Sequence, residues 1–176
     1  IEPVSTRTLP DLPASERGPR RLDDIDRIRA GDRVLLIIEN DVTFATLLLD
    51  VAREHGWKGL VAHRGADGLT MAREQQPQAI TLDINLPDID GWRVLDRLKH
   101  DLPLRHIPVQ VITTEEERER ALRMGAHGVL GKPLKTRDTL DHALVELERY
   151  VTTRTRRLLL AVGDGERRRE LAELLA

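Results

Sequence analysis

The chain has 176 residues, of which 40% are hydrophobic and 33% charged, and it lacks cysteine. That size suits one ordinary domain with extensions, and the lack of cysteine excludes disulfides and cysteine chemistry. The net charge of −2 and the aromatic content of 2% argue against nucleic-acid binding, and no apolar run could span a bilayer. We therefore expect a cytoplasmic chain that contacts neither nucleic acid nor membrane.

The first 31 residues predict a linker. Four prolines stand among polar residues before residue 20, a composition typical of tails and linkers. Leu22, Ile25 and Ile28 then recur at near-helical spacing, which predicts a short helix within 21–30 that Gly31 would end. Because the chain starts at Ile1 rather than at Met, we expect it to be a piece of a longer protein.

Residues 32–152 alternate between apolar runs and helical patterns. The run Val34–Ile38 is continuously apolar, as is typical of a strand buried on both faces of a parallel sheet. Further strands are predicted at 60–62, 79–82, 109–112 and 128–130. Helices are predicted at 44–54, 66–74, 91–100, 115–124 and 140–151. This alternation predicts an α/β domain, in which right-handed crossovers cover both faces of a parallel sheet.

Polar side chains stand at the carboxyl ends of four of these strands. Ligands of such folds bind beyond those ends, so the polar residues there are candidate site residues. The central one is Asp83, a lone carboxylate that an apolar strand holds in a fixed position. The others are Glu39 and Asn40 after the first strand, Thr113 after the fourth and Lys132 after the fifth.

These features together resemble the receiver domain of two-component response regulators, over residues 33 to about 150. The resemblance rests on the Glu39-Asn40 pair, the LDxxLPxxDG pattern around Asp83, Thr113 after the fourth strand and the Lys132-Pro133 pair. It implies a flavodoxin-like five-stranded parallel sheet in the order 2-1-3-4-5 with helices on both faces. It also implies a phosphoryl group, donated by a histidine kinase or a histidine phosphotransfer domain.

The resemblance assigns a role to each candidate residue. Asp83 would accept the phosphoryl group, Thr113 would bind it and switch rotamer, and Lys132 would pair with the aspartate or its phosphate. Mg²⁺ would be held by Glu39, Asn40, Asp83 and the backbone carbonyl of Asn85, and Pro133 would follow a cis peptide bond. The need for charge compensation explains these residue types, because a carboxylate attacks a phosphoryl group only where nearby cations offset the negative charges of both groups.

Two positions depart from the family pattern. Asn40 replaces an acid that normally ligates the metal, so we expect weaker Mg²⁺ affinity. Asp41 is interpreted first as a helix N-cap and second as a replacement for that acid. Val129 stands where the family has an aromatic switch residue, so coupling to Thr113 would have to run through the loop that follows Thr113.

Three functions from different classes remain open at this point. The first is a phosphoacceptor receiver with its own phosphorylation and dephosphorylation chemistry, which leaves its status as an enzyme open. The second is a degenerate receiver that acts as a phosphorylation-independent interaction module. The third, a phosphatase with an aspartyl nucleophile, lacks the expected second acid two residues after Asp83. A homodimer is a further alternative. The aliphatic stripe at 140–151 is interpreted first as part of the core and second as a dimer surface.

The last residues look like the start of a second copy. The apolar run 157–162 predicts a strand, and Leu171, Leu174 and Leu175 follow in a charged helix. We assign 153–176 to a linker and the first strand–helix unit of a second, truncated receiver. Tandem receivers resemble the C-terminal part of a hybrid sensor histidine kinase.

Overall fold

A five-stranded parallel sheet forms the centre of the computed structural model, which describes residues 23–133, 136–153 and 163–174. The strand order is β2-β1-β3-β4-β5, and every paired strand runs parallel to its neighbour, so the predicted topology is confirmed. The strands are β1 (Arg33–Ile38), β2 (Trp57–Ala62), β3 (Ala79–Asp83), β4 (Val109–Thr114) and β5 (Gly128–Lys132).

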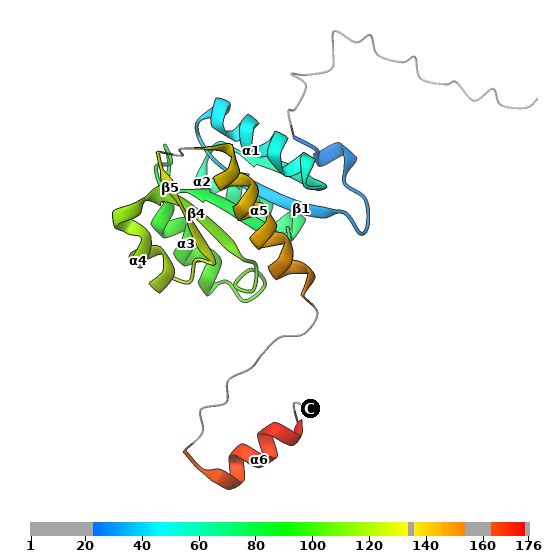
Figure 1. Cartoon of the computed structure of the whole chain (residues 1–176), viewed down its shortest axis with the longest axis vertical. Helices are drawn as coiled ribbons and strands as arrows, with labels where there is room; N and C mark the ends of the chain where they lie inside the picture. The colour runs from blue at the N-terminus through cyan, green and yellow to red at the C-terminus, as the bar shows by residue number, and fades with distance from the viewer. Residues whose placement is uncertain (1–22, 134–135, 154–162, 175–176) are drawn as a thin grey trace, which may run out of the picture.

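Helices cover both faces of the sheet, as the alternation predicts (Figure 1). One face packs against α1 and α5 and the other against α2, α3 and α4, so two separate aliphatic cores form. The central strands β1 and β3 are almost entirely buried, which explains why they read as continuous apolar runs. The helices are α1 (Val42–Glu54), α2 (Gly65–Gln75), α3 (Gly91–His100), α4 (Arg118–Arg123) and α5 (Arg137–Thr152).

Several elements differ from the predicted bounds, among them β2 and the helix predicted at 115–124. Strand β2 begins at Trp57 rather than at residue 60, because Trp57 pairs with Arg33 and is buried although Lys58 and Gly59 interrupt the apolar pattern. The helix predicted at 115–124 is divided into the 3-10 turn η3 (Glu115–Glu117) and α4. Strand β4 extends through Thr114, so the chain passes directly from this strand into the turn η3.

The segment before β1 packs onto the edge of the sheet. Its described residues contain the 3-10 turn η2 (Ile25–Arg27) where a helix is predicted within 21–30, and residues 21 and 22 lie outside the described part. Asp24 is 3% exposed and accepts hydrogen bonds from Arg53 at 2.9 and 3.1 Å and from the Gly59 N–H at 3.0 Å. This carboxylate ties the segment to both α1 and β2.

Asp24→Ala should therefore lower the free energy of unfolding by about 2–3 kcal/mol, because Arg53 and the Gly59 N–H lose a buried partner. Burial raises the pKa of Asp24, but hydrogen bonds from Arg53 and Gly59 outweigh burial and lower it below 3.8. The contribution is thus present above pH 3.8 and lost as the pH falls further. Urea denaturation at pH 7 and pH 3 measures both effects. Asp26→Ala, an exposed acid on the same turn, is the control and should change stability little.

The predicted second copy is only partly described. Its helix is present as α6 (Gly165–Leu174), whereas the strand predicted at 157–162 and most of the linker predicted at 1–31 lie outside the described residues. The second receiver unit therefore stays a prediction.

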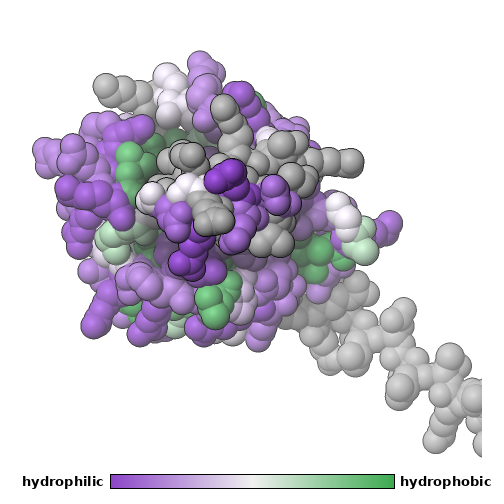
Figure 2. All heavy atoms as spheres, turned by 90° about the horizontal axis from the view of Figure 1, so that it is seen from below, coloured by the Kyte–Doolittle hydropathy of each residue, from purple (hydrophilic) through white to green (hydrophobic). Residues whose placement is uncertain are grey.

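The surface carries few large hydrophobic side chains. The face shown in Figure 2 is mainly hydrophilic, with hydrophobic side chains in small, separate patches. Scattered exposure of this kind is normal for a folded domain. None of the helices in the described residues has the length and apolar character needed to cross a membrane.

Candidate functional site

Asp83 ends strand β3 in the middle of the sheet, with its side chain only 2% exposed. Asp83 pairs in register with Ile112 on β4. One residue earlier on β3, Leu82 pairs with Ile38 on β1. The Lys132 Nζ lies 2.9 Å from Asp83 Oδ1, so the ends of β3 and β5 are joined by an ion pair. The predicted pairing of these two residues is present in the structure.

Glu39 places a second buried carboxylate beside the first. Its side chain is 0% exposed, and Oε1 accepts a hydrogen bond from the Asp41 N–H at 3.0 Å. Oε2 has no hydrogen-bond partner in the described part of the chain, and the Lys132 Nζ lies 3.8 Å away. Burial, followed by the charge of Asp83, raises the pKa of Glu39 to about 7. Two carboxylates thus share one cation in a poorly solvated space.

Lys132 is held over an aromatic ring. Its Nζ lies 5.8 Å from the centre of the Phe44 ring on α1, and its side chain is 32% exposed. A cation above a ring face is attracted to it, so Phe44 helps to keep the ammonium group near both carboxylates. The sequence pattern placed Phe44 in the core stripe of α1 and gave no sign of this contact.

The loop after β3 wraps closely around Asp83. The Asn85 N–H donates to Asp83 Oδ1 at 3.2 Å. Further along, Gly91 lies so close to the loop that a Cβ atom there would be 2.4 Å from the Ile84 Cα and 2.6 Å from the Asp83 carbonyl oxygen. Only glycine permits this approach, which explains the glycine that closes the LDxxLPxxDG pattern.

Two acids of the same loop act as helix caps. Asp88 accepts hydrogen bonds from the N–H groups of Gly65 and Ala66 at 2.8 and 3.0 Å, at the start of α2. Asp90 accepts one from the Trp92 N–H at 3.0 Å, at the start of α3. These bonds fix the loop between two helices, and they explain acids that the sequence alone left without a role.

The remaining predicted residues lie at the same edge of the sheet. Thr113 is 5% exposed near the end of β4, one residue past the partner of Asp83. Asn40 is exposed just beyond β1, and Asp41 caps α1 through the Thr43 and Phe44 N–H groups, which confirms the cap interpretation. Ion pairs of Lys132 thus join Glu39 and Asp83, whereas Asn40 and Thr113 share only their location at this edge of the sheet.

The donor set suits a hard divalent cation. Magnesium takes oxygen ligands, keeps several waters and usually binds only one or two carboxylates. Glu39 Oε2 is a buried oxygen without a hydrogen-bond partner, beside the Asp83 carboxylate, and it fits this requirement. Within the described residues, no third His, Cys, Asp or Glu side chain joins such a group, so amide and carbonyl oxygens would have to complete it.

A family model described as "Response regulator receiver domain" matches residues 35–144, more than half of the chain. The chain is also similar to the polar-differentiation response regulator DivK of Brucella anthropi, with 32% identity over 103 residues. That match covers 57% of this chain and 84% of the relative.

Solved structures share the fold. The signal receiver domain of a DNA-binding response regulator from Colwellia psychrerythraea is 25% identical, with a TM-score of 0.61 over 67% of this chain and 99% of that one. The receiver domain of the sensor histidine kinase PA1611 from Pseudomonas aeruginosa is 22% identical, with a TM-score of 0.60 over 69% and 99%. The latter structure has a magnesium ion coordinated in its active-site cleft.

Proposed function

The chain belongs to the response regulator receiver domain family, and we propose that it takes a phosphoryl group onto Asp83 in a magnesium-dependent step of a two-component phosphorelay. The observation that carries this proposal is the buried Asp83 carboxylate with the Lys132 ammonium group 2.9 Å away. A nucleophilic carboxylate needs such a cation because the incoming group is itself negative.

The donor in this proposal is a phosphohistidine of a histidine kinase or of a phosphotransfer domain. An Asp83 carboxylate oxygen attacks phosphorus, a P–O bond forms and the P–N bond breaks, and the histidine leaves as imidazole after taking a proton from solvent. Magnesium would supply a positive charge shared by carboxylate and phosphoryl oxygens. Lys132 then turns from the carboxylate to a phosphoryl oxygen, and the Asn85 N–H and the Thr113 hydroxyl are the nearby donors.

The charge of the site supports magnesium as a partner in this step. Among the described residues, Glu39 Oε2 has no hydrogen-bond partner, and burial together with the nearby charge of Asp83 raises the pKa of Glu39. A divalent cation would relieve this repulsion. We place Glu39, Asn40, Asp83 and the Asn85 carbonyl around it.

A degenerate receiver is the second candidate, and the exposed amide at Asn40 favours it because the site lacks a third carboxylate. Beryllofluoride, which mimics a bound phosphoryl group, separates the two functions when it is added with magnesium and the Thr113 amide is followed by NMR. A saturable shift of Thr113 at millimolar magnesium supports phosphoacceptance. An unchanged spectrum would establish the degenerate receiver.

Asn40→Asp should tighten magnesium binding about tenfold, because a carboxylate restores a negative charge beside Glu39. Isothermal titration calorimetry with Mg²⁺ measures the change. Asp41→Asn is the matched control: its side chain still accepts from the α1 N–H groups, and its loss of charge should leave the affinity unchanged. Equal affinities in Asn40→Asp and the parent chain would contradict the placement of residue 40 at the metal.

We also propose a wider setting for the domain. The repeat-like pattern after residue 157 supports an origin in a hybrid histidine kinase with tandem receivers, and the composition supports a cytoplasmic location. Limited proteolysis of the full-length protein, followed by mass spectrometry of the stable fragments, would reveal whether a second folded unit follows residue 153.

A further inference from the structure

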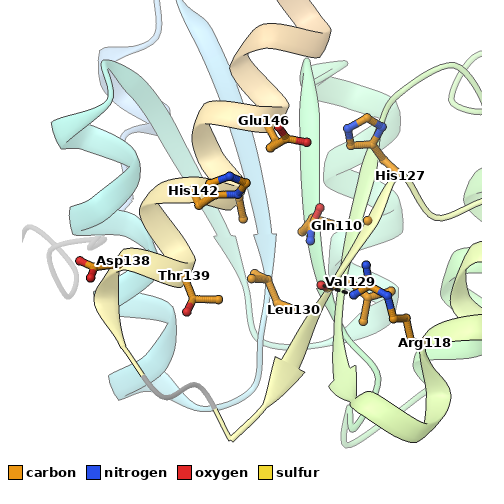
Figure 3. A pocket seen from close by; sticks show the side chains of 11 residues that line it. Gln110, Arg118, His127, Val129, Leu130, Asp138, Thr139, His142 and Glu146 are labelled. Atoms are coloured by element: carbon orange, nitrogen blue, oxygen red, sulfur yellow. Dashed lines mark hydrogen bonds between the residues drawn. The ribbon is translucent and has the colours of Figure 1, made fainter.

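A second concave site lies away from Asp83, beside the edge strand β5. This pocket has a volume of about 550 Å³ and opens between α5 and the start of α4 (Figure 3). Its floor is formed by the first three residues of β5, Gly128, Val129 and Leu130, with Gln110 of β4 beside them. Gln110 lies three residues before Thr113, so this pocket and the phosphorylation site occupy different levels of the sheet.

The Gln110 side chain is the unusual group in this pocket. It is 6% exposed, and in the part of the chain that the structure describes its amide makes no hydrogen bond. In the sheet it pairs in register with Thr81 on one side and Gly128 on the other, and neither residue makes a hydrogen bond to its side-chain amide. The amide is open to the pocket and has no hydrogen-bond partner among the described residues, so it is suited to a ligand.

Gly128 makes room for that amide. A Cβ atom at this position would lie 2.5 Å from Gln110 Oε1 and 3.0 Å from Nε2, so the amide group lies directly against the glycine. The backbone at Gly128 has no positive φ that would require glycine. Glycine at the start of β5 therefore lets the Gln110 amide lie against the backbone of this strand.

The walls add polar groups around an apolar floor. His142 and Glu146 lie one turn apart on α5 and project toward the β5 side of the pocket (Figure 3). The small Ala143 between them leaves space above Val129 and Leu130. Arg118 closes the opposite side, where its guanidinium group donates to the Val129 carbonyl at 3.4 Å.

We propose that this pocket binds a purine nucleoside through its adenine edge, with Gln110 as the recognising group. A glutamine amide pairs with adenine in two hydrogen bonds, since Oε1 accepts from the N6 amino group and Nε2 donates to N7. The apolar floor takes the ring and the His142 imidazole packs against its face. Glu146 accepts from ribose hydroxyls, and with Asp138 it disfavours a polyphosphate.

An NMR titration of the complete chain with adenosine tests the proposal. Saturable shifts are expected at the amides of Val129, Leu130 and Ala143. Inosine, which has an acceptor in place of the N6 donor, should bind about tenfold more weakly or worse. The proposal is overturned if millimolar adenosine gives no saturable shifts, or if adenosine and inosine bind equally.

Two variants locate the recognising group. Gln110→Met keeps the side-chain volume and should weaken adenosine binding about tenfold or more without lowering the melting temperature. Gln75→Met makes the same replacement at the exposed end of α2 and should bind as the parent chain does. Unchanged binding in Gln110→Met overturns the assignment. Asp83→Asn should bind adenosine normally, so the outcome is independent of phosphorylation.

Discussion

Asp83→Asn should abolish phosphorylation of the chain by a small phosphodonor such as acetyl phosphate, with labelling reduced about 100-fold or more. A neutral amide is a poor nucleophile toward phosphorus, and it also removes a charge that would attract magnesium. Phosphate-affinity electrophoresis and intact mass, both measured with and without Mg²⁺, give the labelled fraction. The parent chain should label only when magnesium is present.

The loss of labelling should not reflect unfolding. The charge of Asp83 contributes to the raised pKa of Glu39, so its removal relieves repulsion and should leave the domain at least as stable at pH 8. Asp90→Asn is the matched control on the same loop, because its side chain can still accept from the Trp92 N–H. Labelling that persists in Asp83→Asn would identify a different acceptor.

The two strands that lead to Glu39 and Asp83 are predictable because each is almost entirely buried on both faces. Val34–Ile38 and the strand before Asp83 need apolar residues at every position, so the run and the polar residue at its end are both visible in the sequence. The first residue of the edge strand β2 is harder to predict, because Lys58 and Gly59 interrupt the apolar pattern after the buried Trp57.

Contacts between residues far apart in the chain are not predictable in this way. Asp88 caps a helix that starts 23 residues earlier, and Asp24 binds an arginine 29 residues later. Gln110 and Gly128 look like an ordinary polar residue and an ordinary glycine until the sheet sets them side by side. The local sequence around each residue does not indicate these contacts, because the tertiary fold brings the partners together.

Glu39→Gln should stabilise the metal-free domain at neutral and alkaline pH. The pKa of Glu39 is raised from 4.5 to about 7 in the folded protein, so the folded state holds this proton more tightly than the unfolded state does. The resulting stability is fully present below pH 4.5 and is lost as the pH rises through about 7. The shift corresponds to about 3 kcal/mol at most, which the neutral amide recovers at pH 8.

The same substitution should weaken magnesium binding. Glu39 must lose its proton before it can ligate a cation, so the affinity of the parent chain should fall about tenfold per pH unit below pH 7. Glu39→Gln should bind Mg²⁺ about tenfold or more weakly at pH 8, and its remaining affinity should lose this pH dependence. Calorimetric titrations from pH 5.5 to about pH 8.5 would trace both curves.

The opposite signs of these two effects distinguish Glu39 from a merely structural acid. A buried carboxylate with a purely structural role would, on replacement, lose stability and leave the magnesium affinity unaltered. Glu74→Gln, on the exposed surface of α2, is the control and should change neither quantity. A melting temperature for Glu39→Gln at pH 8 below that of the parent chain would show that Lys132 already satisfies both carboxylates. The site would then have no excess negative charge for magnesium to neutralise.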